Sequence, residues 1–201
     1  MGLMRVGLLG GSFDPVHHAH LLLAQTALKH LKLDKVQIIP AGQPWQRPAL
    51  GASPEHRLNM LHLATKGLDN IEINPIEIHR TGPTYTIETL EALEPNHEYF
   101  WILGSDQLAN FCTWRSWQDI AHRVKLAVAQ RPGSLLTPPL ALSQWLQSQN
   151  RTLFVIPFEP QDVSATAIRQ RLALQQSARD LLPEVVEQYI YEHGLYRPHS
   201  A

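Results

Sequence analysis

A glycine pair followed by closely spaced histidines is the part of this sequence most suited to chemistry. Residues 10–21 read GGSFDPVHHAHL, directly after an apolar run and before a helix-like stretch. Gly10 and Gly11 permit a tight turn, and the N–H groups there and at the helix N-terminus favour an anion without a basic side chain. His17 and His20 stand three residues apart, so both could donate hydrogen bonds to one phosphate chain. The segment predicts a phosphate-binding site.

Two other interpretations of the histidines remain open. They could be ordinary polar residues at a helix start, or they could hold a metal ion. A metal needs a third or fourth ligand, and no cysteine or HExxH-type partner stands nearby, so we expect no metal site made by protein side chains. The segment matches neither G-x-G-x-x-G nor G-x-x-x-x-G-K-[ST], which excludes the usual dinucleotide fingerprint and the lysine-bearing P-loop.

A second candidate anion site lies far along the chain, in residues 163–169, VSATAIR. Ser164 can cap a helix while the first N–H groups of that helix face an anion, and Thr166 adds a second hydroxyl. Arg169 suits bidentate contact with phosphate. Taken alone, this pattern is also an ordinary helix start, and it gains weight only beside the first motif.

Alternating apolar strands and amphipathic helices would position both motifs. We expect strands at residues 4–9, 36–39, 71–73, 99–103, 124–129 and 153–156, and helices at 18–32, 54–66, 84–93, 106–111, 140–148, 166–174 and 183–193. This alternation predicts right-handed βαβ crossovers and a doubly wound, Rossmann-like α/β fold with a mostly parallel sheet. Residues 1–201 would form a single domain, with a small C-terminal helical part from about residue 164.

Local signals mark helix ends and loops. Ser53 and Pro54 suit the N-cap and first position of a helix, and Gly194 suits a helix C-cap. The Pro- and Gly-rich segments 41–52 and 131–139 are expected to be long loops after the carboxyl ends of strands, where open α/β sheets bind ligands.

Composition limits the classes of partner. The chain has 17 Lys and Arg against 18 Asp and Glu, so no overall positive charge favours nucleic acid or a membrane. A single cysteine, Cys112, excludes an intrachain disulfide. The sequence has neither a signal-peptide pattern nor a membrane-spanning apolar run, so a cytoplasmic location is expected.

The two motifs resemble those of the nucleotidyltransferase superfamily with His-x-Gly-His and Ile-Ser-x-Thr-x-x-Arg signatures. Here they read His17-His18-Ala19-His20, with Ala19 at the signature's glycine, and residues 163–169. More closely, the sequence from about Val6 to Tyr196 is similar to bacterial nicotinate-nucleotide adenylyltransferases, which transfer AMP from ATP to nicotinate mononucleotide in NAD biosynthesis.

The resemblance implies roles for residues on the ATP side of the site. Asp106 would bind the ribose of the adenylate, because a carboxylate accepts hydrogen bonds from sugar hydroxyls; it could instead cap a helix. The catalytic residues would be His17, His20 and Arg169. The implied ATP-binding residues are Gly10, Gly11, Ser12, Phe13, Gly104, Asp106, Ser164 and Thr166.

The acceptor side is likewise implied by resemblance. Trp114 would stack on the pyridine ring, and main-chain N–H groups at Thr86 and Arg115 would meet the ring carboxylate, which favours the acid over the amide. Tyr85 belongs to the same segment as Thr86, and Arg47 would lie beside the acceptor phosphate. Trp114 could also be an ordinary core residue.

The resemblance implies direct transfer with Mg2+ bound mainly through the ATP phosphates, since a phosphate dianion can attack without a general base. It leaves open a monomer or a homodimer, and we expect no nucleic-acid or membrane partner. Two alternatives remain: a sister adenylyltransferase that uses phosphopantetheine or nicotinamide mononucleotide, and a non-catalytic nucleotide-binding regulator.

Overall fold

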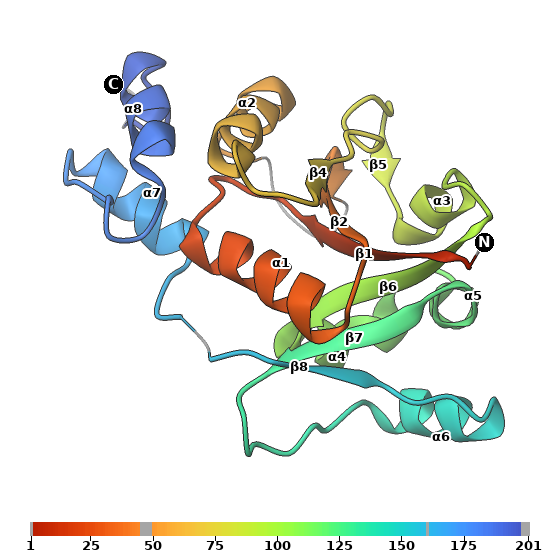
Figure 1. Cartoon of the computed structure of the whole chain (residues 1–201). Helices are drawn as coiled ribbons and strands as arrows, with labels where there is room; N and C mark the ends of the chain where they lie inside the picture. The colour runs from red at the N-terminus through yellow and green to blue at the C-terminus, as the bar shows by residue number, and fades with distance from the viewer. Residues whose placement is uncertain (1, 45–49, 160, 198–201) are drawn as a thin grey trace.

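A six-stranded parallel sheet forms the centre of the fold in the computed structural model, which describes residues 2–44, 50–159 and 161–197. The strands follow the spatial order β4-β2-β1-β6-β7-β8, and each neighbouring pair is parallel (Figure 1). The expected doubly wound α/β fold is therefore confirmed. The strands are β1 (Met4–Gly11), β2 (Lys35–Pro40), β4 (Ile71–Ile73), β6 (His97–Gly104), β7 (Lys125–Gln130) and β8 (Phe154–Pro157).

The strand order reverses between β1 and β6. From β1 the chain passes outward to β2 and β4, and from β6 it passes the other way to β7 and β8. Loops on the two sides of such a reversal diverge, which opens a crevice beyond the carboxyl ends of the strands. Gly10 and Gly11 end β1 and Gly104 ends β6, so this crevice is where the glycine turn lies.

Helices cover both faces of the sheet (Figure 1). Alternate strand residues supply the two apolar cores: Phe100 and Ile102 belong to one core cluster, and Trp101 and Leu103 to the other. The first cluster includes α1 (His18–His30), α2 (Pro54–Thr65), α7 (Ala165–Ala173) and α8 (Glu184–Glu192). The second includes α3 (Thr86–Glu91), α4 (Ser105–Asn110), α5 (Trp117–Arg123) and α6 (Leu140–Ser148).

The local signals for helix ends are confirmed. The Ser53 hydroxyl accepts a hydrogen bond from the His56 N–H, with Pro54 at the first position of α2. Gly194 follows α8 with a φ of 61°, in the left-handed region that glycine occupies without strain. None of the described helices is long and apolar enough to cross a membrane.

Several short elements differ from the expectation. A two-stranded sheet pairs β3 (Gln43–Pro44) with β5 (Pro83–Thr84), so Thr84 belongs to a strand and α3 begins only at Thr86. The segment 112–123, for which no helix or strand was predicted, contains part of the 3-10 helix η1 (Phe111–Thr113) and the whole of α5. Strands of two residues carry no periodicity, so their pairing depends on contacts between distant segments.

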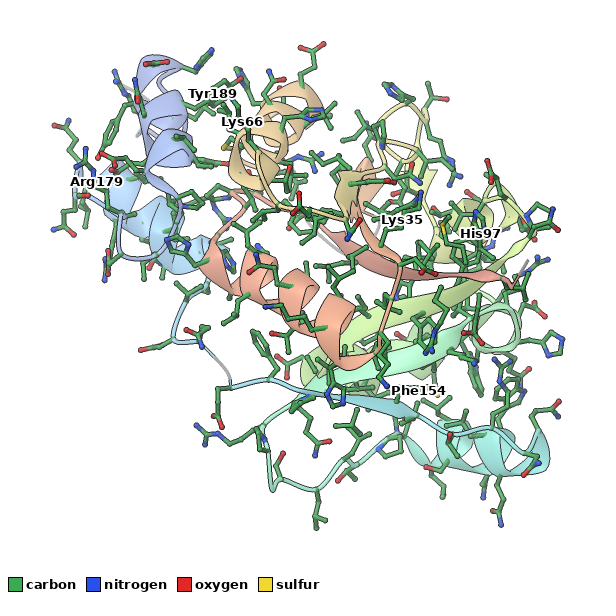
Figure 2. All side chains as sticks on the ribbon, viewed as in Figure 1. Lys35, Lys66, His97, Phe154, Arg179 and Tyr189 are labelled. Carbon is green, nitrogen blue, oxygen red and sulfur yellow. The ribbon has the colours of Figure 1, made fainter. Side chains whose placement is uncertain are left out.

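The C-terminal helices pack beside the first turn of α1 and beside α2 (Figure 1). The His18 N–H donates to the carbonyl of Leu181, which joins the start of α1 to the segment between α7 and α8. Tyr189 extends from α8 towards α2, where its hydroxyl meets His56 Nδ1 at 2.9 Å and accepts from Asn59 (Figure 2). This packing brings α7 to the carboxyl edge of the sheet.

Candidate active site

The glycine turn lies against aromatic rings on both sides. A Cβ atom added at Gly10 would lie 3.1 Å from the Trp101 ring, and one at Gly11 would lie 3.0 Å from the Phe13 ring. Phe13 itself is buried, with a φ of 48°. Side chains at the two glycine positions would therefore displace the rings that hold the turn in place.

His17 and His20 stand together at the start of α1. Their rings stack with centroids 3.7 Å apart, as their spacing predicted, whereas His18 is exposed. The main-chain N–H of His17 donates a hydrogen bond to Nδ1 of the His20 ring over 3.3 Å. Because Nδ1 of His20 accepts this hydrogen bond, the neutral ring carries its proton on Nε2, which makes Nε2 a donor for an anion. Ala19, at the signature's glycine, fits within the first turn of α1.

His17 differs from His20 in being nearly buried, with only 6% of its surface exposed. Burial, with a smaller effect from the nearby His18, lowers the pKa of His17 from 6.5 to about 4. Its imidazole is therefore neutral at pH 7 and can act as a hydrogen-bond donor but not as a cation. Its Nδ1 atom is buried without a hydrogen-bond partner among the described residues.

The low pKa of His17 makes stability depend on pH. The pKa of His17 is about 4 in the folded protein and 6.5 in the unfolded chain. Between these two pH values the unfolded chain therefore binds more protons than the folded protein. As the pH falls from 6.5 to 4, the free energy of unfolding decreases. Above pH 6.5 the effect is absent. We expect the wild type to lose about 2 kcal/mol more than a His17→Gln variant between pH 7 and pH 5, as measured by urea unfolding. Equal losses would contradict the low pKa.

Arg169 extends from α7 to residues 10–15, the segment that contains the glycine turn and Asp14 and is called the phosphate turn below. Its guanidinium donates to the Asp14 carbonyl over 2.7 Å and to the Thr166 hydroxyl over 3.3 Å. Ser164 caps α7 by accepting from the Ala167 N–H, as the sequence predicted. The chain therefore brings its two sequence motifs together, although Asp14 and Arg169 are 155 residues apart.

A cavity of about 290 Å³ opens beside the glycine turn. Gly10, Gly11 and Ser12 form part of its wall, and α4 contributes Asp106 and Asn110. The remaining lining residues include Thr84 and Thr86 from the α3 side, and Trp101 and Trp114. His17, His20 and Arg169 are not among the described residues that line this cavity.

Trp114 and Thr86 line the same cavity, as the resemblance implied. The Trp114 ring lies against Phe111 and Trp101, with centroids 5.4 and 6.3 Å apart, so the tryptophan is both partly in the core and part of the wall.

Tyr85 and Arg115 pair with each other beside this cavity but are not among its described lining residues. The Arg115 guanidinium lies 4.8 Å from the Tyr85 ring centroid and also meets Glu88. Arg47, expected beside the acceptor phosphate, lies outside the described residues.

Asp106 faces the cavity from the first turn of α4. The alternative interpretation, in which it caps the helix, is wrong, because the N-cap is Gly104 and the Gln107 side chain accepts from the Gly104 N–H. Its carboxylate stands near the helix N-terminus, which favours a negative charge.

Four polar residues at the site, three of them buried and Tyr196 partly buried, were not predicted from the sequence. Glu77 lines the cavity and accepts a hydrogen bond from the Thr89 hydroxyl. Arg57 donates to the carbonyls of Ser12 and Gly42. The other two are Asp14, buried within the phosphate turn, and Tyr196, near the C-terminus. Only Asp14 had a local signal, its place inside the GGSFDP turn.

The chain is similar to known proteins over most of its length. Residues 8–171 match the family model described as cytidylyltransferase-like. A Bordetella parapertussis protein named probable nicotinate-nucleotide adenylyltransferase is 57% identical over 98% of this chain and 100% of its own. One of the same name from Methylibium petroleiphilum is 42% identical over 96% of this chain and 93% of its own.

A solved structure of Plasmodium falciparum nicotinic acid mononucleotide adenylyltransferase complexed with NaAD shares the fold. Its TM-score is 0.75 and its identity 17%, with 96% of this chain and 97% of that chain covered. The match to the family model spans both sequence motifs, and the relatives align along nearly the whole chain. On these grounds the chain belongs to the cytidylyltransferase-like nucleotidyltransferases and, among them, to the nicotinate-nucleotide adenylyltransferase family.

Proposed function

We propose that this enzyme transfers the AMP part of ATP to the phosphate of nicotinate mononucleotide, forming nicotinate adenine dinucleotide and pyrophosphate in NAD biosynthesis. The observation that carries the proposal is the place of the glycine turn. Gly10, Gly11 and Ser12 line the cavity that contains Trp114, and the same turn leads into His17 and the contact with Arg169. An acceptor phosphate and the phosphates of ATP would therefore meet at this turn.

The reaction requires alignment and charge stabilisation more than proton transfer. The acceptor phosphate is largely dianionic at neutral pH and can attack the α-phosphorus without a general base. Attack from the cavity side would drive pyrophosphate out towards α1 and α7, in line with the breaking bond.

Three side chains would stabilise the negative charge that develops on the leaving pyrophosphate. His20 would donate through Nε2, and the neutral His17 would act as a dipolar donor. Arg169 would supply the positive charge, supported by the N–H groups at the start of α7 and by Ser164 and Thr166.

We propose that Mg2+ accompanies ATP and is held mainly through phosphate oxygens. The described residues contain no group of three or more His, Cys, Asp or Glu side chains able to hold a metal ion. The imidazole and guanidinium donors around the glycine turn complement phosphate oxygens, so they fit a metal–nucleotide complex in which the ion binds the phosphates. The ion would neutralise charge on the phosphates while the side chains hold their position.

The cavity would receive the nicotinate ring beside Trp114, and Asp106, which lines the same cavity, would bind the ribose of the adenylate. Thr86 opens α3, and its N–H has no partner within that helix. A ring carboxylate would accept from such donors, whereas the NH2 group of the amide would leave them unpaired. We therefore propose that the acid form is preferred.

The test is pyrophosphate release from ATP and Mg2+ with three separate acceptors: nicotinate mononucleotide, nicotinamide mononucleotide and phosphopantetheine. Fastest release with nicotinate mononucleotide is the expected result. Release with phosphopantetheine alone would indicate a sister adenylyltransferase and remove the acceptor assignment. No release with any acceptor would indicate a nucleotide-binding regulator.

Trp114→Ala should mainly weaken acceptor binding. Loss of the stacking surface is expected to raise the KM for nicotinate mononucleotide roughly tenfold or more while changing kcat much less, because stacking acts on the ground state and the transition state alike. Steady-state kinetics at saturating ATP measure both constants.

Trp117→Ala is the matched control. Trp117 also packs against Phe111, at 6.2 Å between centroids, but is not among the described residues that line the cavity. It should lower stability without changing the acceptor KM. An unaltered KM in Trp114→Ala would return Trp114 to a purely structural role.

A further inference from the structure

The carboxylate of Asp14 joins three segments that are distant in sequence. Asp14 lies in the phosphate turn and is only 2% exposed. Its Oδ2 atom accepts from the Gly51 N–H at 2.7 Å, and its Oδ1 atom accepts from the Ala52 N–H at 3.0 Å and from the Tyr196 hydroxyl at 2.7 Å. A buried carboxylate with three donors is held in one orientation.

Arg169 is held at the same residue. One guanidinium nitrogen donates to the Asp14 carbonyl at 2.7 Å and stands 3.8 Å from Asp14 Oδ2. The guanidinium side chain remains 34% exposed, so it can still meet an anion. The orientation of Arg169 therefore depends on the backbone and the carboxylate of Asp14.

The Tyr196 ring completes this packing. A Cβ atom added at Gly51 would lie 2.9 Å from the Tyr196 ring and 3.4 Å from Arg169 Cδ, so the ring and the stem of the arginine cover the same glycine. Burial, followed by the charge of Asp14, raises the pKa of Tyr196 far above its usual value. The hydroxyl therefore stays protonated and remains a donor to Asp14 at any working pH.

Arg57 supports the cluster from the buried side. It is fully buried, donates to the Ser12 carbonyl at 2.8 Å, and feels the negative charge of Asp14, which opposes the lowering of its pKa by burial. Two guanidinium groups thus flank one carboxylate: Arg57 from the interior and Arg169 from the substrate side. Only Arg169 is free to turn towards solvent, so it is the group whose position needs fixing.

We propose that Tyr196 is a positioning residue: by fixing the carboxylate of Asp14, it holds the guanidinium of Arg169 against the phosphate turn in the orientation that binds the phosphates of ATP. This inference rests on the role proposed above for Arg169. It assigns part of the support of the nucleotide site to Tyr196 in the C-terminal segment. The same carboxylate also anchors Gly51 and Ala52, so the turn and the start of α2 share this support.

The test is a kinetic cycle built on Tyr196→Phe, which removes one hydroxyl group. We expect kcat for pyrophosphate release to fall about tenfold in the wild-type background, the size expected for one lost hydrogen bond to a charged group. In an Arg169→Lys background, the same change should alter kcat by less than about twofold, because the group that Tyr196 positions is already replaced. An equal factor in both backgrounds would overturn the proposal.

Tyr189→Phe is the matched control. It also removes a tyrosine hydroxyl that joins the C-terminal region to α2, through His56 and Asn59, but it has no contact with Asp14 in the described structure. It should lower the melting temperature without lowering kcat. If Tyr189→Phe and Tyr196→Phe reduced kcat alike, Tyr196 would have only a structural role.

Hydrogen exchange gives a readout that is independent of the acceptor. Amides at the start of α7, residues 165–170, should exchange faster in Tyr196→Phe than in the wild type or Tyr189→Phe, because Arg169 loses its fixed contact. Equal protection in all three proteins would overturn the proposal. A wild type that releases no pyrophosphate would instead contradict the proposed function, and an Arg169→Lys variant with full activity would contradict the role proposed for Arg169. In the first case the exchange result would still decide whether Tyr196 holds the start of α7.

Discussion

Replacement of His20 by alanine is expected to lower kcat about 10²- to 10³-fold, the usual effect of removing one donor to developing negative charge. The structure gives the reason for a large effect: Nδ1 of His20 accepts from the main-chain N–H of His17, which leaves the proton on Nε2 as the donor. The measurement is kcat for pyrophosphate release at saturating ATP and nicotinate mononucleotide.

The fold should survive this change. His20 is only partly buried, and its loss removes one hydrogen bond at a helix start, worth about 1 kcal/mol. His18→Ala is the matched control, because His18 is the exposed neighbour and its N–H bond to the Leu181 carbonyl is kept in alanine. A His20→Ala protein with unchanged kcat would remove His20 from the mechanism.

Replacement of Asp14 by alanine should have the largest effect on stability. It removes the acceptor for Gly51, Ala52 and Tyr196. It also leaves the buried Arg57 without its nearby negative charge. Breaking a buried charge pair by deleting one partner costs about 3–5 kcal/mol, because the remaining charge is left uncompensated. Urea unfolding at pH 7 measures the change.

Asp180→Ala separates this effect from the loss of any aspartate–arginine pair. Asp180 pairs with Arg171 at 2.9 Å, but both side chains are largely exposed. Water screens such a pair, so its removal should leave the free energy of unfolding almost unchanged. If the two variants were equally stable, the Asp14 carboxylate would not support the phosphate turn.

Features governed by local sequence could be predicted. The apolar runs of the six sheet strands, the Ser53 and Ser164 caps and the glycine turn each depend on residues close together in the chain. The resemblance also implied that the two motifs belong to one site, and the hydrogen bond from Arg169 to the Asp14 carbonyl brings them together. The roles of the individual residues stay predictions until they are measured.

Features that depend on distant contacts could not be predicted. Arg57 occupies a helix with mixed polar and apolar residues, and nothing near it indicates that it donates to a carbonyl 45 residues away. Glu77 lies in a segment without clear periodicity, and its burial follows from the β3–β5 pairing and the packing of Thr89. In each case a polar group is buried because another segment covers it, and single-sequence periodicity does not report such cover.

The hydrogen bond between Asp14 and Tyr196 joins residues 182 positions apart. A ribosome makes Asp14 182 residues before Tyr196, so the growing chain carries the glycine turn without this contact until the whole of that stretch has been synthesised. Contacts of such separation form late, after the entropy of closing a long loop has been overcome. Chains that end before Tyr196 would carry both sequence motifs yet lack this contact, so Asp14 and Arg169 would be held less firmly in them than in chains that include Tyr196.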